Sequence, residues 1–245
     1  DEINSALGTN AFITDYDKAV SKRIKIESIE EEIDLLARID DLILIGEAKS
    51  IVTTDSEISK HRTSEVLQHA GEQVVRKTEF IKANLETVFD RLNWSYDANK
   101  NYKFAGFIIN SSRIFVGYAF NSMPVIDEKI LRAYFSSNEI NLLTVISQGE
   151  FKPVAWYRLY DNINELKDNF GKYITTPPQL HANTKRYEYN EIGFPYLNSD
   201  SYKISKKYLV FKSGDLLAPM EQEHSFPVIK SADYDSEVET INVAL

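Results

Sequence analysis

The chain lacks cysteine, and this absence limits both its chemistry and its compartment. Disulfide bonds and thiolate zinc sites are excluded, and a reducing cytoplasm is the expected location. Long apolar runs are missing too, since none approaches the roughly 20 residues that a membrane-spanning helix needs. The first segment is neither basic nor apolar, so we expect no signal peptide and no membrane partner. Because the chain begins with Asp1 rather than Met, we expect a processed product or a piece of a longer chain with further domains.

Positive charge is in short supply. Lys and Arg number 28 against 37 Asp and Glu, which gives a formal net charge of −9. Nucleic-acid-binding modules usually carry a basic patch, so this balance disfavours a simple DNA-binding module. The negative net charge does not exclude a nuclease, because a metal ion supplies local positive charge and basic residues can cluster. Basic clusters occur at 22–25, 60–62 and 76–77, where they form either solvated faces or phosphate contacts.

Common catalytic motifs are also absent. The sequence has no P-loop, no GxGxxG, no GxSxG and no HExxH motif. Nucleotide hydrolysis, serine-hydrolase chemistry and zinc-peptidase chemistry therefore lose their usual support. What the chain does have is 245 residues, 43% of them hydrophobic, which suffices for one large domain or a core with an accessory domain.

The first half of the chain shows two different hydrophobic periods. Residues 22–29 alternate like a strand, and 31–49 predict two strands joined at Asp40–Asp41. The second of these strands contains LILIG, a continuous apolar run that is typical of a strand covered on both faces. Residues 59–92 then follow the three-and-four spacing of an amphipathic helix, in which Gly71 is the expected place of a break.

The later segments complete a mixed order of strands and helices. We predict strands at 102–110, 113–120, 140–146 and 207–212, and helices from Asp127 to Ser136 and at 156–170. Strands, then a long helix, then further strands and a helix indicate an α/β fold with a mixed central sheet flanked by helices. The expected division is a core at 1–150 and a C-terminal accessory region at 151–245.

A group of charged side chains is predicted on the hairpin. If Asp40–Asp41 is a two-residue turn, Asp34 faces Glu47 and Glu32 faces Lys49. Directly opposed side chains point to the same side of a sheet, with Cβ atoms roughly 5 Å apart. Because strand side chains alternate, Glu47 and Lys49 also share a side. This register therefore predicts one patch of two or three carboxylates and a lysine.

Such a patch suits a divalent cation. Mg²⁺ and Mn²⁺ take carboxylate, water and phosphate oxygens, and the ion activates water and polarises a phosphate. A nearby lysine stabilises developing negative charge. The alternative is a salt-bridged, solvated hairpin face. Against it, Ile43 and Ile45 lie on the same side, so the charges sit at the end of a buried strand, where an unpaired charge is costly.

The order of these residues along the chain resembles that of the PD-(D/E)XK nuclease superfamily. Glu32-Ile33-Asp34 comes first, Glu47-Ala48-Lys49 then ends an apolar strand, and a long helix follows. The resemblance is to bacterial restriction-endonuclease-like and nuclease-related members, and it covers residues 22–146. It implies that Asp34 and Glu47 bind metal and that Lys49 assists catalysis. It also implies a glutamine on the following helix, for which Gln73 is the first candidate and Gln68 the second.

The sequence departs from the family at two points. Ile33 replaces the proline that often precedes the first acid, and no upstream glutamate is assigned, so Glu32 or Glu27 is a candidate substitute. The resemblance implies a restriction-endonuclease-like core that hydrolyses phosphodiester bonds, in DNA before RNA, with Mg²⁺ or Mn²⁺. A role in defence or restriction follows on the same basis, and cutting of both strands would imply a homodimer. The alternatives are an inactive interaction module with the nuclease fold and an RNA-cleaving toxin domain.

Overall fold

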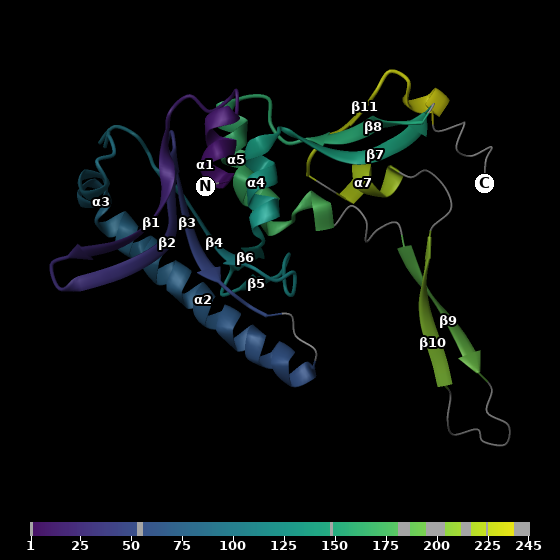
Figure 1. Ribbon diagram of the computed structural model, residues 1–245, viewed down its shortest axis with the longest axis horizontal. Helices are drawn as coiled ribbons and strands as arrows, with labels where there is room; N and C mark the ends of the chain where they lie inside the picture. The colour runs from purple at the N-terminus through teal and green to yellow at the C-terminus, as the bar shows by residue number, and fades with distance from the viewer. Residues whose placement is uncertain are drawn as a thin grey trace. The chain divides into compact units, whose positions relative to one another are not determined.

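The computed structural model describes residues 2–52, 56–147, 149–180, 187–194, 204–211, 217–223 and 225–237 (Figure 1). The chain forms two compact units. The first comprises Asp1–Ile140 and Arg158–Pro177, and the second comprises Asn141–Tyr157 and Pro178–Leu245. This division differs from a single boundary near residue 150, because helix α5 (Ile163–Thr175) returns to the first unit. All the candidate site residues belong to the first unit.

A six-stranded sheet forms the centre of the first unit, with the order β1-β2-β3-β4-β6-β5. The β1–β2 and β2–β3 pairs are antiparallel, whereas β3–β4 and β4–β6 are parallel. The sheet is therefore mixed, and the predicted α/β class is confirmed (Figure 1). The strands span Tyr16–Ile26 (β1), Ile29–Ile39 (β2), Leu42–Lys49 (β3), Lys103–Asn110 (β4), Ala119–Phe120 (β5) and Met123–Ile126 (β6).

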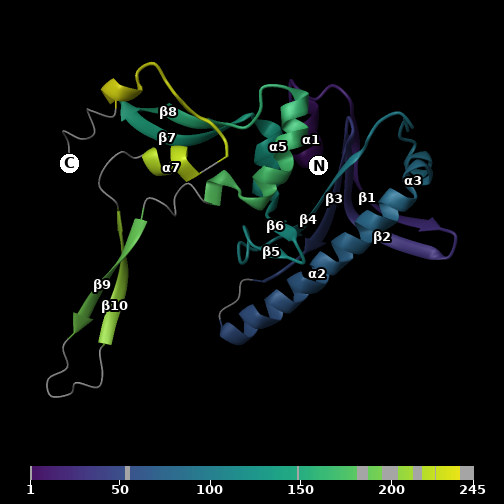
Figure 2. The same cartoon turned by 180° about the vertical axis from the view of Figure 1, so that it is seen from behind.

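Helices cover both faces of this sheet, as two adjacent residues of β4 show. A Cβ added to Gly106 would lie 2.7 Å from Val74 of α2 (Glu57–Ala83). The next residue, Phe107, packs its ring against Phe170 of α5, with the ring centroids 5.9 Å apart. Because neighbouring strand residues point to opposite faces, α2 covers one face and α5 the other. Helices α1 (Glu2–Thr9) and α4 (Glu128–Ser136) pack together and α4 contacts α5 (Figure 2).

Helix α2 continues through Gly71, so the break expected there is wrong. A Cβ on Gly71 would collide with the carbonyl oxygen of Phe120, which means that glycine is needed for close approach to β5. The chain instead changes direction at Asn84, before α3 (Leu85–Leu92). None of the described helices is long and apolar enough to cross a membrane.

Of the remaining predicted elements, some are confirmed and others are wrong. The strands expected at 102–110 and 140–146 are confirmed as β4 and β7 (Glu139–Ser147), and Asp127 caps α4 as predicted. The strand expected at 113–120 is wrong except for the two residues of β5, because Phe115 and Gly117 adopt positive φ in a turn. The helix expected at 156–170 is wrong in its first part, where β8 (Glu150–Arg158) runs instead.

The second unit is built from strands and a short helix. Strands β7, β8 and β11 (Val228–Lys230) form a sheet in the order β11-β8-β7. Strands β9 (Tyr187–Phe194) and β10 (Ile204–Phe211) form an antiparallel hairpin, and α7 spans Ala218–Glu223. The strand expected at 207–212 falls within β10, apart from Lys212, which lies outside the described residues.

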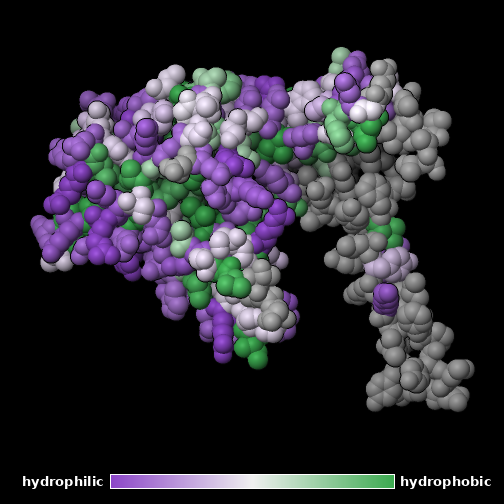
Figure 3. Space-filling view, in the orientation of Figure 1, coloured by the Kyte–Doolittle hydropathy of each residue, from purple (hydrophilic) through white to green (hydrophobic). Residues whose placement is uncertain are grey.

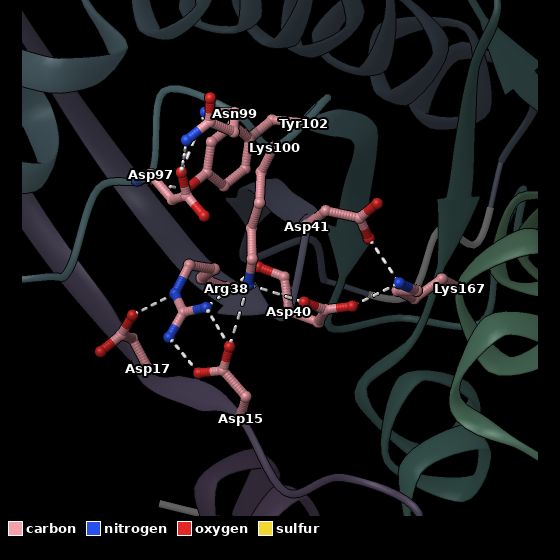
Figure 4. A network of polar contacts seen from close by, with 10 residues as sticks. All are labelled: Asp15, Asp17, Arg38, Asp40, Asp41, Asp97, Asn99, Lys100, Tyr102 and Lys167. Carbon is pink, nitrogen blue, oxygen red and sulfur yellow. Dashed lines mark hydrogen bonds and ion pairs between the residues drawn. The ribbon is translucent and has the colours of Figure 1, made fainter.

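The turn between β2 and β3 is fixed by ion pairs at the end of the sheet away from Lys49. Asp40 has a φ of 53°, a conformation that Asp tolerates. Its carboxylate binds Lys100 at 2.8 Å and also Lys167, whose side chain is only 5% exposed. Lys167 additionally lies 2.7 Å from Asp41 (Figure 4). These contacts hold the turn, and the turn fixes the register of the two strands that carry the candidate site.

Buried Arg38 connects this turn to the segment before β1. Its guanidinium binds Asp15 at 2.6 Å, contacts Asp17, and donates to the carbonyl oxygen of Asp40 at 3.0 Å (Figure 4). The hydrogen bond from Arg38 lowers the pKa of Asp15 from 3.8 to about 2, with a further contribution from Lys100. The carboxylates thus compensate the buried guanidinium, as a buried charge requires.

Acid is expected to remove the stabilisation that Asp15 provides. Because its pKa lies below the unfolded value of 3.8, the stabilisation is present above about pH 4 and is lost as the pH falls toward 2. Half of the side chain is exposed, so Asp15→Asn should cost only about 1 kcal/mol at pH 6. Urea unfolding at pH 6 and pH 2.5 should show this difference shrinking. The exposed Asp90→Asn variant is the control, and an unchanged difference at both pH values would contradict the assignment.

Candidate active site

The candidate site lies where the pairing of β2 with β3 ends. The register predicted from the two-residue turn is confirmed from Ile39↔Leu42 to Leu35↔Gly46. Beyond this pair, Asp34 accepts a hydrogen bond through Oδ2 from the backbone amide of Ala48 at 2.8 Å. This bond places the Asp34 carboxylate at the peptide bond between Glu47 and Ala48.

Glu47 is the most enclosed member of the group, with only 3% of the residue exposed. Its Oε1 accepts from Lys49 Nζ at 2.6 Å, and its Oε2 is bound by Lys77 Nζ. The two lysines differ in access, because the Lys49 side chain is 23% exposed whereas that of Lys77 is 5% exposed. A buried carboxylate is therefore held between one accessible and one inaccessible ammonium group.

Helix α2 supplies two of these partners. The side-chain oxygen Oε1 of Gln73 accepts a hydrogen bond from Lys49 Nζ at 2.8 Å, so the first glutamine candidate does lie beside the lysine. Lys77 follows Gln73 by four residues, a spacing that places both on the same face of the helix. That face packs on β3 and β4 and delivers the two side chains to the carboxyl end of β3.

Glu32 does not join the patch, contrary to the alternation assumed from the sequence. It pairs with Arg23 of β1 at 2.7 Å, and this ion pair lowers the pKa of Glu32. The reason is a bulge: the partners of Ile33 and Leu36 are Lys22 and Val20, so β2 carries one extra residue there. Ile33 and Leu36 consequently share one core cluster although they are three residues apart.

The bulge turns Glu31 toward α2 instead. Its carboxylate accepts two hydrogen bonds from Arg76, at 2.6 and 2.9 Å, and is 8% exposed. These bonds raise the pKa of Arg76, and Glu47 adds a smaller Coulombic contribution. Hydrophilic residues dominate the surface around the β1–β2 hairpin, where Glu32 and Arg23 are exposed (Figure 3).

Gln68, the second glutamine candidate, lies elsewhere. Its side chain donates to Asn121 Oδ1 at 2.5 Å, and its backbone oxygen accepts from Asn121 Nδ2 at 3.0 Å. This exposed pair joins α2 to the turn after β5. Gln68 therefore serves the attachment of the helix rather than the carboxylate group.

Sequence reasoning missed Lys77, although a signal was present. Ala70, Val74 and Ile81 form the buried stripe of α2, and Lys77 occupies the position of that stripe between Val74 and Ile81. A lysine at an otherwise apolar buried position needs a buried anion as its partner. Glu47, at the end of the strand beneath the helix, is that anion.

The donor set of the site suits a hard cation. Mg²⁺ and Mn²⁺ accept carboxylate oxygens and take their remaining ligands from water and phosphate. Asp34 and Glu47 would hold the ion once the accessible Lys49 turns away from Glu47 Oε1. Within the described ranges, no group of three or more His, Cys, Asp or Glu side chains is placed to hold a metal. The formal charges of Asp34, Glu47, Lys49 and Lys77 balance, so the group is already compensated.

Comparisons with protein-family models, with curated proteins and with solved structures each found no match.

Proposed function

We propose that the first unit is a restriction-endonuclease-like domain of the PD-(D/E)XK type, which hydrolyses phosphodiester bonds in nucleic acid, DNA before RNA. The observation that supports the proposal is the meeting of Glu47, Lys49 and Gln73 at the carboxyl end of β3, with Asp34 bound to the intervening amide. The mixed sheet with helices on both faces is compatible with this fold.

Each side chain has a distinct role in the proposal. Asp34 and Glu47 bind Mg²⁺ or Mn²⁺, which would polarise the phosphate and lower the pKa of a bound water. Lys49, released from Glu47, stabilises negative charge that develops on the phosphate oxygens. Gln73 holds the Lys49 ammonium in position through its side-chain oxygen. Lys77 remains on Glu47 Oε2 and keeps that carboxylate oriented.

One observation favours a second candidate, a catalytically inactive interaction module with the same fold. Both oxygens of Glu47 are engaged by ammonium groups, and the carboxylate is buried. A closed ion-pair network of this kind can serve stability and specificity of folding without any chemistry. The two candidates make opposite predictions for cleavage.

A cleavage assay separates the candidates. Purified protein is incubated with supercoiled plasmid and with single-stranded RNA, in Mg²⁺, Mn²⁺ or EDTA. We expect DNA cutting with either metal, none with EDTA and none from Asp34→Ala, because that variant lacks a ligand. Glu32→Gln is the matched control and should cut like the wild type, since Glu32 pairs with Arg23.

Three results would change the conclusion. Cutting of RNA alone would indicate an RNA-cleaving domain. Absence of cutting under all conditions would favour the inactive module. Equal cutting by wild type and Asp34→Ala would assign the activity to a contaminant and remove the proposal.

A further inference from the structure

A pocket adjoins the candidate site at the carboxyl ends of three parallel strands. It encloses about 420 Å³ and is bordered by Lys49 at the end of β3, Asn110 at the end of β4, and Asp127 directly after β6. In sheets of this kind, ligands characteristically bind outside the carboxyl ends of the strands. The volume also falls in the range of roughly 300–1,000 Å³ that is usual for small-ligand pockets.

Two further cations border the pocket. Arg113 and Lys129 are exposed, and neither makes an ion pair with any residue in the described part of the chain. Asp127 and Glu128 also contribute to the wall, so the formal balance of the lining is three cations against two anions. The Asp127 carboxylate is engaged in capping α4, where it accepts from the amide of Ile130 at 2.8 Å. Lys49 is already paired with Glu47, so Arg113 and Lys129 are the two cations of the lining that make no ion pair within the described residues.

Arg113 is presented by a well-braced turn. Asn110 is fully buried; its Oδ1 accepts from the Ser112 amide at 3.1 Å, and its Nδ2 donates to the Ile114 carbonyl at 2.8 Å. Ser112 Oγ accepts from the Ile114 amide at 3.1 Å. The backbone on both sides of Arg113 is thus fixed, while its own side chain makes no ion pair with the residues that the structure describes. A planar guanidinium presented by such a turn is suited to bidentate binding of an oxyanion such as phosphate.

We propose that this pocket binds a phosphate of the nucleic-acid backbone through Arg113 and Lys129, next to the phosphate that is cut beside Lys49. The inference rests on the proposed nuclease function and adds the path of the substrate, which crosses the carboxyl ends of β3, β4 and β6. The hydroxyl group of Ser50 on the pocket wall provides a further donor to phosphate oxygens, whereas the Ser111 hydroxyl is engaged with the backbone of Ile51. The shared chemistry is the phosphodiester, whether it comes from DNA or from RNA.

Binding without cleavage tests this inference. Fluorescence anisotropy with a labelled DNA duplex and with RNA of the same sequence, both in EDTA, measures affinity over a series of salt concentrations. Arg113→Gln and Lys129→Gln should each raise Kd about tenfold, because each removes a charge-assisted hydrogen bond to phosphate. The slope of log K against log salt should become shallower by about 1 in each variant. Arg91→Gln, at an exposed position of α3, is the matched control and should bind like the wild type.

The outcomes separate this inference from the nuclease proposal. Weaker binding by both pocket variants, with wild-type circular dichroism, supports the pocket, and the RNA and DNA arms show which backbone it prefers. Wild-type binding by both variants, alongside cutting that Asp34→Ala abolishes, overturns the pocket and leaves the nuclease intact. If both pocket variants bind more weakly and the wild type does not cut, the pocket is supported and the nuclease proposal is overturned. Binding by none of the proteins overturns the pocket.

Discussion

Replacing Lys49 with alanine is expected to lower the rate of phosphodiester cleavage about 10²- to 10³-fold, the usual loss when one group that stabilises transition-state charge is removed. Metal binding should survive, because the ligands are Asp34 and Glu47. Lys49 occupies Glu47 Oε1 in the structure, so its removal frees that oxygen and binding of Mn²⁺ should be as tight or tighter. Asp34→Asn should lose cleavage and metal binding together.

Two independent measurements separate the effect on cleavage from the effect on metal binding. Titration with Mn²⁺, followed by calorimetry or by electron paramagnetic resonance, gives the metal affinity without any substrate. Single-turnover cleavage of a labelled duplex gives the chemical step. Lys82→Ala is the control, because Lys82 is an exposed lysine in the last turn of α2 that pairs with Glu79 and lies over the ring of Phe104. A Lys49→Ala protein that cuts at the wild-type rate would remove Lys49 from the mechanism.

Replacing Lys77 with methionine is expected to lower the free energy of unfolding by about 3 kcal/mol. Breaking a buried ion pair by removing one partner costs roughly 3–5 kcal/mol, since the other charge is left in a poor environment. Glu47 retains Lys49 as a second partner, which places the expectation at the lower end of that range. This loss of stability is expected even if the protein has no enzymatic activity.

The measurement is urea unfolding of Lys77→Met, of Glu47→Gln and of the double variant. The double variant should be destabilised by less than the sum of the two single variants, because neither charge is left alone. Lys82→Met makes the same substitution at an exposed position of α2 and should change stability by less than about 0.5 kcal/mol. Additive effects in the cycle would show that the Lys77–Glu47 contact carries no coupling energy.

Local sequence signals sufficed for much of the first unit. The Asp40–Asp41 turn, the apolar run of β3 and the spacing of α2 each depend on residues close together in the chain, and each was predicted. The turn also predicted that Asp34, Glu47 and Lys49 lie close together, whereas Gln73 was a candidate only through the resemblance to the nuclease family. The turn, the strand and the helix were predictable because turn chemistry and hydrophobic period act within a few residues.

The remainder depends on long-range packing. Gly71 is explained only by the approach of Phe120, a residue far along the chain, so a glycine that looked like a helix breaker is a packing requirement. Trp156 and Tyr157 pair with β11, which lies about 70 residues further along the chain, and this pairing overrides their helical pattern. Arg113 and Lys129 share a pocket because parallel strands end at the same edge of the sheet.

The extra residue in β2 affects how this chain is aligned with related sequences. In a strictly alternating strand, every second residue before Arg38 would point toward α2, and these residues are Leu36, Asp34 and Glu32. In the folded chain the glutamate that meets α2 is Glu31, an odd step from Asp34. A motif search with fixed even gaps between acids would select the solvent-facing glutamate in this chain, and an alignment needs a one-residue offset here before its columns compare equivalent side chains.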